Sequence, residues 1–360
     1  MSNQGMTRAQ RIVLVTIARN EADRIARLLA SVRPWVDSML VLDTGSDDDT
    51  AEIARQLGAR VEQYEWSDDF SAARNVALDH AGGDWHLVLD ADEWLAQGGE
   101  FLRQVRQQPA DWAGQVRLDD VLDSWAPQGC VARNWLSRLL PGHLRYAGRI
   151  HEQPVHALPV RRTPLVIAHD GYRPDALVSK RGRNRRLLLR ELQERPDDAY
   201  LLYQVGKDAS VYEEHDLAHA CLAAACERGD RQASWRLDLI IRWIAAMKHL
   251  GLHGQAAALA HQERTRYGFS PDFHFAVGDL MLDWTATAPD RTDDLLAEAE
   301  QAWRRCLAIG ERPDVPGSVP GRGSHLAAFN LALLLEVTGR SAEACGLRRS
   351  HGLAEAALLS

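Results

Sequence analysis

Two aspartates with one residue between them, Asp90 and Asp92, follow an apolar run that starts at Trp85. Side chains alternate between the two faces of an extended backbone, so this spacing predicts that both carboxylates point the same way where a strand ends. In an open parallel α/β sheet, ligands bind beyond that end of the strands. Paired carboxylates are preferred ligands of Mg2+ and Mn2+, which share them with the phosphates of a substrate. The motif therefore indicates a metal and phosphate site, although an acidic strand end that only faces water has the same pattern.

Strand-like and helix-like segments alternate along the first part of the chain and would position this pair. Apolar runs rich in β-branched residues predict strands buried on both faces of a sheet. These runs span residues 12–17, 39–42, 60–64 and 85–93. Between them apolar residues recur at helical spacing, so a helix is expected after each of the first three strands. This alternation specifies a mostly parallel, Rossmann-like α/β sheet with right-handed crossovers.

The glycine-rich phosphate loops of many nucleotide-binding proteins are missing from the sequence. No G-x-x-x-x-G-K-[ST] segment is present, and no G-x-G-x-x-G follows the first strand. The segment Gly321-Arg322-Gly323 lacks a third glycine and a preceding strand. A nucleotide would therefore be held by acids at strand ends and by a metal.

A resemblance to family-two glycosyltransferases is carried by four segments in order: TIARNEADRIARLLASV, VLDTGSDDDTAEIA, EWSDDFSAARNVAL and GDWHLVLDADEW. They resemble the nucleotide-sugar domain of that family over residues 11–95, and weaker matches extend to about residue 210. The resemblance implies an inverting enzyme with the α/β GT-A fold. Similar proteins carry tetratricopeptide-like helices after the catalytic domain, and bacterial peptide S-glycosyltransferases are among them.

The resemblance implies a role for each matched position. Asp90 and Asp92 match the D-x-D pair, which contacts the ribose and the metal, Mn2+ or Mg2+. Arg74 matches the arginine of the A-R-N segment, near the nucleotide. The positions that match the nucleoside pocket are Thr16, Ala18, Asn20 and Asp43. Without the resemblance, Asp43 could equally cap the following helix, and Arg74 could form a surface ion pair.

The next part of the chain is expected to serve the acceptor. From Ala113 onward the pattern changes to short, irregular strands. Two segments match the family here: R-I-H-E, which ends at Glu152, and H-x-G-Y, which starts at His169. A histidine at a strand end beside a carboxylate site is a candidate metal ligand, although a lone histidine more often only packs and hydrogen bonds.

A further carboxylate is needed as the catalytic base. Inverting transfer requires a group that takes the proton of the acceptor. Asp90 and Asp92 are assigned to the ribose and the metal, so the predicted base is Glu152, with Asp170 as the alternative. A structural Glu152 paired with Arg149 would give the same sequence.

The chain beyond residue 195 is expected to be almost wholly helical. Helix pairs are predicted to begin near Ala199, Ala233, Asp272 and His325. The early spacings are close to the roughly 34-residue period of tetratricopeptide repeats. Such a stack buries its own core and offers a concave face to peptides or partner proteins. Two domains are predicted, a catalytic domain over 1–195 and a helical domain over 196–360, and the second is also a candidate surface for a homo-oligomer.

A basic segment, KRGRNRRLLLR at residues 180–190, joins the two predicted domains. It could meet phosphate or an anionic membrane face. A solvated helix face leading out of the catalytic domain is the alternative, which a short run in an acidic chain favours.

Composition narrows the classes of protein. The 360-residue chain is 46% hydrophobic and 26% charged, as in ordinary globular proteins of two domains. Its net charge of -8 disfavours nonspecific nucleic-acid binding. The five cysteines form no C-x-x-C pair, which favours reduced thiols in the cytoplasm. No apolar run approaches the roughly 18 residues of a membrane span, and no signal peptide is expected.

Together these features predict a cytoplasmic, metal-dependent inverting glycosyltransferase of the hexosyltransferase class. The resemblance implies a nucleotide-diphosphate sugar donor, a UDP-sugar first, and a peptide, protein or glycan acceptor. Two other classes stay open. One is a nucleotidyltransferase on a similar sheet, against which the missing glycine-rich basic loop argues. The other is a non-catalytic repeat scaffold, against which the joint presence of Asp43, Arg74 and the D-x-D pair argues.

Overall fold

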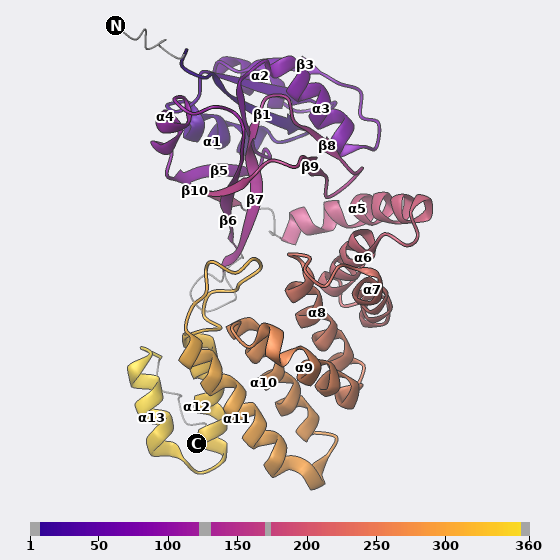
Figure 1. The fold of residues 1–360 in the computed structure, drawn as a ribbon, viewed down its shortest axis with the longest axis vertical. Helices are drawn as coiled ribbons and strands as arrows, with labels where there is room; N and C mark the ends of the chain where they lie inside the picture. Colours follow the sequence, from indigo (N-terminus) through magenta and orange to yellow (C-terminus); the bar gives the residue numbers. More distant parts are fainter. Residues whose placement is uncertain (1–7, 122–130, 170–173, 354–360) are drawn as a thin grey trace, which may run out of the picture. The chain divides into compact units, whose positions relative to one another are not determined.

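The computed structural model describes residues 8–121, 131–169 and 174–353. The chain forms two compact units, Met1–Leu187 and Leu188–Ser360, and the division between them falls inside helix α5, Pro174–Glu194 (Figure 1). The first unit contains the sheet, and the described part of the second unit is helical. The functional limit expected between residues 195 and 196 stays a prediction.

Among the described residues of the first unit, eight strands form one sheet in the order β3-β2-β1-β4-β7-β6-β10-β5. The strands are β1 (Ile12–Ala18), β2 (Ser38–Asp43), β3 (Arg60–Gln63), β4 (Trp85–Val88), β5 (Glu93–Gln97), β6 (Ala113–Val121), β7 (Val131–Pro141) and β10 (Val160–His169). Strands β3, β2, β1 and β4 are mutually parallel, and β10 is parallel to β6. Strand β7 runs antiparallel to β4 and β6, and β5 runs antiparallel to β10. The predicted fold class, a mostly parallel α/β sheet followed by a helical region, is confirmed for the described residues.

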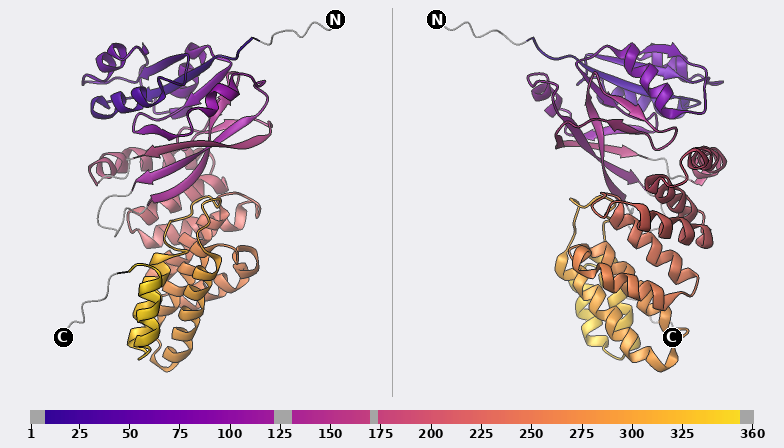
Figure 2. Two further views of the ribbon diagram at one scale, coloured as in Figure 1. Left: turned by 90° about the vertical axis from the view of Figure 1, so that its left-hand side faces the viewer. Right: turned by 45° about the vertical axis from the view of Figure 1, so that its right-hand side comes forward.

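Helices cover both faces of this sheet because buried strands alternate their side chains between the faces. On one face Ile12 and Leu14 of β1 pack with α1, α2 and α4, and on the other Val13 and Val15 pack with α3. Helices lie on both sides of the sheet in the ribbon views (Figure 2). These helices are α1 (Ala22–Val32), α2 (Thr50–Gln56), α3 (Phe70–Ala81) and α4 (Phe101–Val105). The continuous apolar runs of the sequence thus correspond to strands buried on both sides.

The strand that precedes the two aspartates is shorter than predicted. Strand β4 ends at Val88, and Asp90 and Asp92 lie in a turn in which the Glu93 amide donates to the Asp90 carbonyl at 3.0 Å. The chain turns here because β5 begins at Glu93 and pairs with β10 at the edge of the sheet. The expectation that both carboxylates leave one extended strand on the same face is therefore wrong.

The segment that ends at Glu152 is not one continuous strand. A separate two-stranded sheet pairs β8 (Arg145–Ala147) with β9 (Gln153–Val155), and Glu152 lies in the connection between them. His151 in this connection has a φ of 52°, which an extended strand does not allow. Glu152 therefore precedes a strand and does not end one.

The second unit is built from helix pairs. They are α6 (Ala199–Val211) with α7 (His215–Arg228), α8 (Arg236–His249) with α9 (His253–Tyr267), α10 (Pro271–Thr285) with α11 (Thr292–Ile309), and α12 (His325–Val337) with α13 (Ser341–Ser350). Gly278 lets α10 approach α11 closely, because a Cβ there would lie 2.6 Å from the indole nitrogen of Trp303. The pairs begin close to the predicted positions, which confirms the tetratricopeptide-like organisation of this region.

Two expectations from composition concern the cysteines and the membrane. The cysteines of the described residues, Cys221, Cys226, Cys306 and Cys345, are free thiols, and Cys130 lies outside those residues. In the described parts of the chain, no helix combines the length and the apolar character needed to cross a bilayer.

Candidate functional site

Parallel strands bring the predicted site residues to one edge of the sheet. Strands β1, β2, β4 and β10 run in the same direction, because β7 lies antiparallel between β4 and β6 and β10 is parallel to β6. Their carboxyl ends therefore share one edge, where ligands bind in sheets of this kind. The strand ends and loops at this edge carry Ala18, Asn20, Asp43, Asp90, Asp92 and His169.

The loop after β1 is joined to the loop after β2. The carbonyl of Ala18 accepts from the amide and the hydroxyl of Thr44 at 2.9 and 3.2 Å. The side chain of Asn20 accepts from the Asp47 amide at 2.8 Å, and Asn20 has a φ of 56°, a conformation that asparagine tolerates better than most residues. Thr16 is fully buried, so of the first three nucleoside-pocket candidates only Ala18 and Asn20 lie in or beside the open loop.

Asp43 does not cap the following helix. Its Oδ1 accepts from the Ser46 amide and hydroxyl at 2.9 and 2.6 Å, and its Oδ2 accepts from Gln63 at 3.0 Å. The residue at the N-cap position of α2 is Asp49. Asp43 is 2% exposed and therefore fixes the turn after β2, while its contact with a nucleoside stays a prediction.

Arg74 on α3 is a buried cation shared by two carboxylates. Its Nη2 lies 2.9 Å from Asp90 Oδ1 and 2.6 Å from Glu152 Oε1, and its Nε donates to the same Glu152 oxygen at 2.8 Å. The guanidinium also lies over the ring of Tyr146, 5.2 Å from its centroid. With 3% of its side chain exposed, Arg74 is not the surface ion pair that the sequence left open.

Asn75, the next residue of the A-R-N segment, holds the acceptor-side loop against α3. Its side chain donates to the Tyr146 carbonyl at 2.9 Å and accepts from the Tyr146 amide at 2.8 Å. The Phe70 amide at the start of α3 donates to the Arg149 carbonyl at 2.8 Å. The N-cap Asp69, which accepts from the Ala72 amide at 2.9 Å, fixes the first turn of the same helix. Helix α3 thus positions both Arg74 and the segment that carries Glu152.

The structure adds Arg138 and Glu93, which the sequence reading missed. Arg138 Nη2 lies 2.7 Å from Asp90 Oδ2 and 3.0 Å from Glu93 Oε1, and Glu93 Oε2 accepts from the Asp90 amide at 2.8 Å. Strand β7 pairs with β4 in a register that places Leu139 opposite Leu87, so Arg138 comes beside the end of β4. A charged residue inside the apolar run WLSRLL was the available signal.

The surroundings lower the pKa of the Asp90 carboxyl group and raise that of the Glu93 carboxyl group. Burial alone would raise the pKa of Asp90, but the charges of Arg138 and Arg74 outweigh it and hold that pKa well below its usual range. Burial raises the pKa of Glu93 to about 7, because the attraction of Arg138 offsets only part of the loss of water and Asp90 adds repulsion. Asp90 is therefore ionised near neutral pH, and the Glu93 carboxyl gains or loses its proton there.

Asp92 and His169 form the second part of the site. His169 Nε2 at the end of β10 lies 3.3 Å from Asp92 Oδ2, and the two side chains are 17% and 10% exposed. No cluster of three or more His, Cys, Asp or Glu side chains suited to a metal occurs among the described residues. One carboxylate and one imidazole are nevertheless ligands that Mn2+ accepts, since such metals keep waters and substrate phosphates in their remaining positions. The donor set fits a metal held jointly by protein and substrate.

The structure describes only one of the two candidate bases, Glu152. Glu152 is paired with Arg74, and its Oε2 has no recorded partner among the described residues. Asp170 lies outside the described residues. Glu152 therefore stands beside the Asp90 network, and its role as a base stays a prediction.

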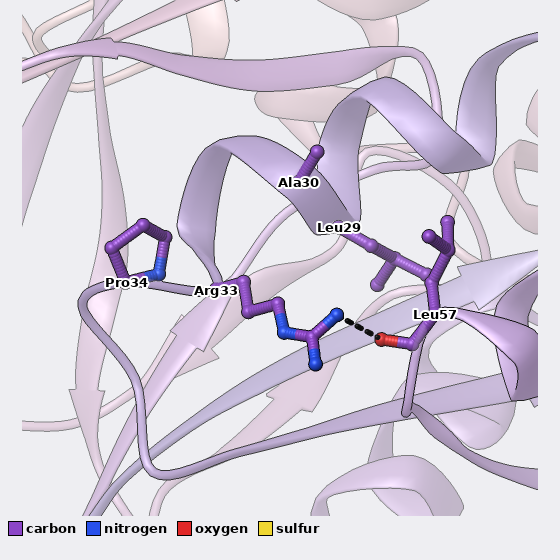
Figure 3. Close-up of a pocket in the computed structure, with 5 residues that line it drawn as sticks. All are labelled: Leu29, Ala30, Arg33, Pro34 and Leu57. Carbon is purple, nitrogen blue, oxygen red and sulfur yellow. Dashed lines mark hydrogen bonds between the residues drawn. The ribbon is translucent and has the colours of Figure 1, made fainter.

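A hollow on the first unit lies away from these residues. It is lined by Leu29, Ala30, Arg33, Pro34 and Leu57, and Arg33 Nη1 donates to the Leu57 carbonyl at 3.4 Å (Figure 3). Helix α1 starts at the carboxyl edge of the sheet and returns to the opposite edge, so its last turn is remote from the carboxylates. The hollow also contains no acidic group, and we do not assign a nucleotide to it.

Residues 13–123, which lie within the first unit, match the model of glycosyl transferase family 2. A TPR repeat-containing protein of Synechococcus elongatus is 36% identical over 247 residues, which cover 64% of this chain and 60% of that protein. The prophage-derived glycosyltransferase SunS of Bacillus subtilis is 28% identical over 211 residues, covering 56% of this chain and 50% of SunS. The chain thus spans 60% and 50% of the length of these two relatives.

Similarity to solved structures is weaker. A crystal structure of glucosyl-3-phosphoglycerate synthase from Mycobacterium tuberculosis, in complex with Mn2+, UDP and glucosyl-3-phosphoglycerate, is 24% identical with a TM-score of 0.25. It covers 32% of this chain and 45% of that chain. The structure of MamA covers 48% of this chain and 88% of that chain at 14% identity and a TM-score of 0.37. With scores this low, neither the ligands nor the metal of these proteins carries over.

Proposed function

We propose that this chain is a metal-dependent inverting glycosyltransferase that moves a sugar from a nucleotide-diphosphate donor, a UDP-sugar first, to an acceptor nucleophile. The observation that carries the proposal is the pairing of Asp92 with His169, next to the arginine-held Asp90, at the carboxyl edge of the domain that matches family two. An inverting transfer needs donor, metal and base in one place, with the acceptor attacking opposite the diphosphate. The carboxyl edge of the sheet carries candidate residues for binding the donor, for holding the metal and for acting as the base.

Asp90 suits a role as a hydrogen-bond acceptor for the donor. Each of its oxygens contacts one arginine, and a carboxylate oxygen can accept more than one hydrogen bond. Its side chain is 35% exposed, so a ribose hydroxyl could reach it. Because Arg138 and Arg74 hold its pKa low, it stays an acceptor at every pH near neutrality.

Asp92 and His169 would hold Mn2+ or Mg2+ together with the donor. The metal, when bound, neutralises negative charge on the leaving diphosphate. These two side chains would present one oxygen from the turn after β4 and one nitrogen from the end of β10, so the site would form only when the sheet is folded.

Glu152 is the proposed base. The Arg74 guanidinium fixes one of its oxygens and leaves Oε2 available to take a proton from the acceptor. Asp170 is the alternative. If Glu152 served only as a counter-ion for Arg74, its basicity would be irrelevant to turnover, and a glutamine there separates the two roles.

The helical unit is the proposed site for a peptide, protein or glycan acceptor. Polar side chains on the first helices of successive pairs interact with one another. Asn330 of α12 donates to Asp279 of α10 at 3.2 Å. Lys248 of α8 lies close enough to influence the same carboxyl, whose pKa burial raises. Polar side chains on a stacked helical face suit recognition of an extended chain. A homo-oligomer through this unit and a cytoplasmic location also stay proposals.

A thermal-shift panel tests the proposed class. Nucleoside diphosphates, nucleotide sugars and nucleoside triphosphates are added with and without Mn2+, and bound ligand at a hundred times its Kd stabilises by about 2.7 kcal/mol. We expect one nucleoside diphosphate and its sugar to raise the unfolding temperature only with Mn2+. A response to triphosphates alone would indicate a nucleotidyltransferase, and no response to any nucleotide would indicate a scaffold.

A further inference from the structure

Asp90 lies in a turn, yet three different elements hold it in place. Its Oδ1 lies 2.9 Å from Nη2 of Arg74 on α3, and its Oδ2 lies 2.7 Å from Nη2 of Arg138 on β7. Its backbone amide donates to Oε2 of Glu93, the first residue of β5, at 2.8 Å. A turn has no strand pairing to fix its side chains, so these contacts decide where the Asp90 carboxylate points.

Arg138 and Glu93 close a ring of contacts with Asp90. The same Nη2 of Arg138 that meets Asp90 also lies 3.0 Å from Glu93 Oε1, and the other oxygen of Glu93 accepts from the Asp90 amide. The side chains of Arg138 and Glu93 are 12% and 2% exposed, so salt screens their attraction only weakly. A planar guanidinium also orients a carboxylate more definitely than a point charge does. The ring therefore fixes the backbone and the side chain of Asp90 together.

Asp90 is the member of this ring that a ligand can reach. Its side chain is 35% exposed, which is well above the values for Arg138 and Glu93. A carboxylate has about four acceptor positions, and the contacts with Arg74 and Arg138 use one on each oxygen. Among the described residues nothing else is recorded on these two oxygens, so each can accept one more hydrogen bond. This arrangement suits two neighbouring hydroxyl groups such as those of a ribose.

We propose that Arg138 and Glu93 are positioning residues for the donor, which hold the Asp90 carboxylate where it accepts hydrogen bonds from the ribose hydroxyls. The inference rests on the proposed function, in which Asp90 binds the donor, and it adds residues of β5 and β7 to the support of the donor site. Neither residue has to touch the nucleotide. A carboxylate that is already oriented loses less conformational freedom when the ligand binds, so its hydrogen bonds contribute more to affinity. Arg74 cannot replace the ring, because it contacts Oδ1 alone and is shared with Glu152.

The test compares UDP with dideoxyuridine diphosphate, which lacks both ribose hydroxyls, in calorimetric titrations with Mn2+. If the panel selects another base, the corresponding pair is used. Wild-type protein should prefer UDP roughly tenfold or more, because hydrogen bonds to a charged group are the strong ones. Arg138→Met should bind UDP about tenfold more weakly and the dideoxy compound as well as the wild type does, so that the preference disappears.

Two variants and a double mutant show whether Arg138 acts through Asp90. Arg138→Lys keeps a positive charge and should restore part of the preference. Glu93→Gln keeps the shape but has a single side-chain oxygen, so it cannot serve the Asp90 amide and Arg138 with separate oxygens, and part of the preference should be lost. In an Asp90→Ala background, Arg138→Met should cause no further loss of UDP affinity.

Arg106→Met is the matched control for lost stability. Arg106 is 24% exposed and pairs with Asp37, which lies just before β2 at the opposite edge of the sheet. Its replacement removes a partly buried ion pair of the same unit without touching the ring. We expect a lower unfolding temperature and an unchanged preference for UDP.

The outcomes separate this inference from the function it rests on. If wild-type protein prefers UDP and Arg138→Met keeps that preference, the inference is overturned while the proposed function stands. Equal losses for both nucleotides would also overturn it, because they would reduce Arg138 to a part of the fold. If Arg138→Met does not fold, full preference in Glu93→Gln overturns the inference instead. If wild-type protein binds no nucleoside diphosphate, the inference and the proposed function fall together.

Discussion

Replacing Arg74 with methionine tests whether the site is organised around a buried cation. The change removes a guanidinium that is 3% exposed and leaves Asp90 and Glu152 without the cation they share. Removing one partner of a buried pair costs about 3–5 kcal/mol. Asp90 keeps Arg138 and is 35% exposed, so we expect about 3 kcal/mol, the low end of that range. For a unit of this size that is a fall of roughly 6–12 °C in Tm.

The loss should depend on pH in a particular direction. The pKa of Asp90 is lowered in the folded protein, so its contribution to stability is present above the unfolded-state value, near 4, and is lost as the pH falls further. The Arg74→Met variant lacks the part of this stabilisation that the Arg74 charge provides at every pH. The difference in Tm between wild type and Arg74→Met should therefore be widest near pH 7 and narrow at about pH 3, as measured by thermal unfolding followed by circular dichroism.

A double-mutant cycle and a surface control make the reasoning refutable. In a Glu152→Gln background, Arg74→Met should lower the free energy of unfolding by at least about 1 kcal/mol less than in the wild type. Only Asp90, and no longer Glu152, then loses a charged partner. Arg55→Met breaks an exposed ion pair with Glu52 and should cost no more than about 1 kcal/mol. Additive single effects, or a loss for Arg74→Met no larger than for Arg55→Met, would refute the account of a buried shared cation.

Two further predictions concern the acceptor. With a hydroxyl acceptor, Glu152→Gln should lower kcat roughly a hundredfold or more with little change in donor affinity, and near-normal turnover would exclude Glu152 as the base and direct attention to Asp170. In the helical unit, Lys248→Ala and Asn330→Ala should weaken acceptor turnover while donor affinity stays unchanged, with the exposed Glu298→Ala as the control. Equal losses in nucleotide binding would show that this unit does not serve the acceptor alone.

Local signals in the sequence were enough to predict the alternating sheet and the edge that carries the site. The apolar run of β1 is buried on both faces, and the acids after β2 and β4 lie at the carboxyl edge, as parallel strands require. The helix pairs of the second unit could be predicted where local signals mark a helix start, such as the N-cap Asp198 that accepts from the Leu201 amide at 3.1 Å.

Contacts between residues far apart in the sequence could not be predicted from such local signals. Arg74 and Glu152 are 78 residues apart, and nothing local favours this pair over Arg149 with Glu152. Arg138 reaches Asp90 only because β7 enters the sheet antiparallel to β4 in one register. The turn at Asp90 depends on β5 pairing with β10, which follows about seventy residues later. Each of these features is set by tertiary structure and not by the neighbouring sequence.

The most direct test of the central claim is turnover of the nucleotide-sugar donor by wild type and Asp92→Ala across a Mn2+ titration. We predict that wild-type turnover rises with Mn2+ and is abolished by a chelator. Asp92→Ala should lose both turnover and the effect of Mn2+ on nucleotide affinity, while it stays folded without ligand at the assay temperature. A folded Asp92→Ala variant that keeps the wild-type dependence on Mn2+ would contradict the assignment of this edge as a metal-assisted glycosyl-transfer site.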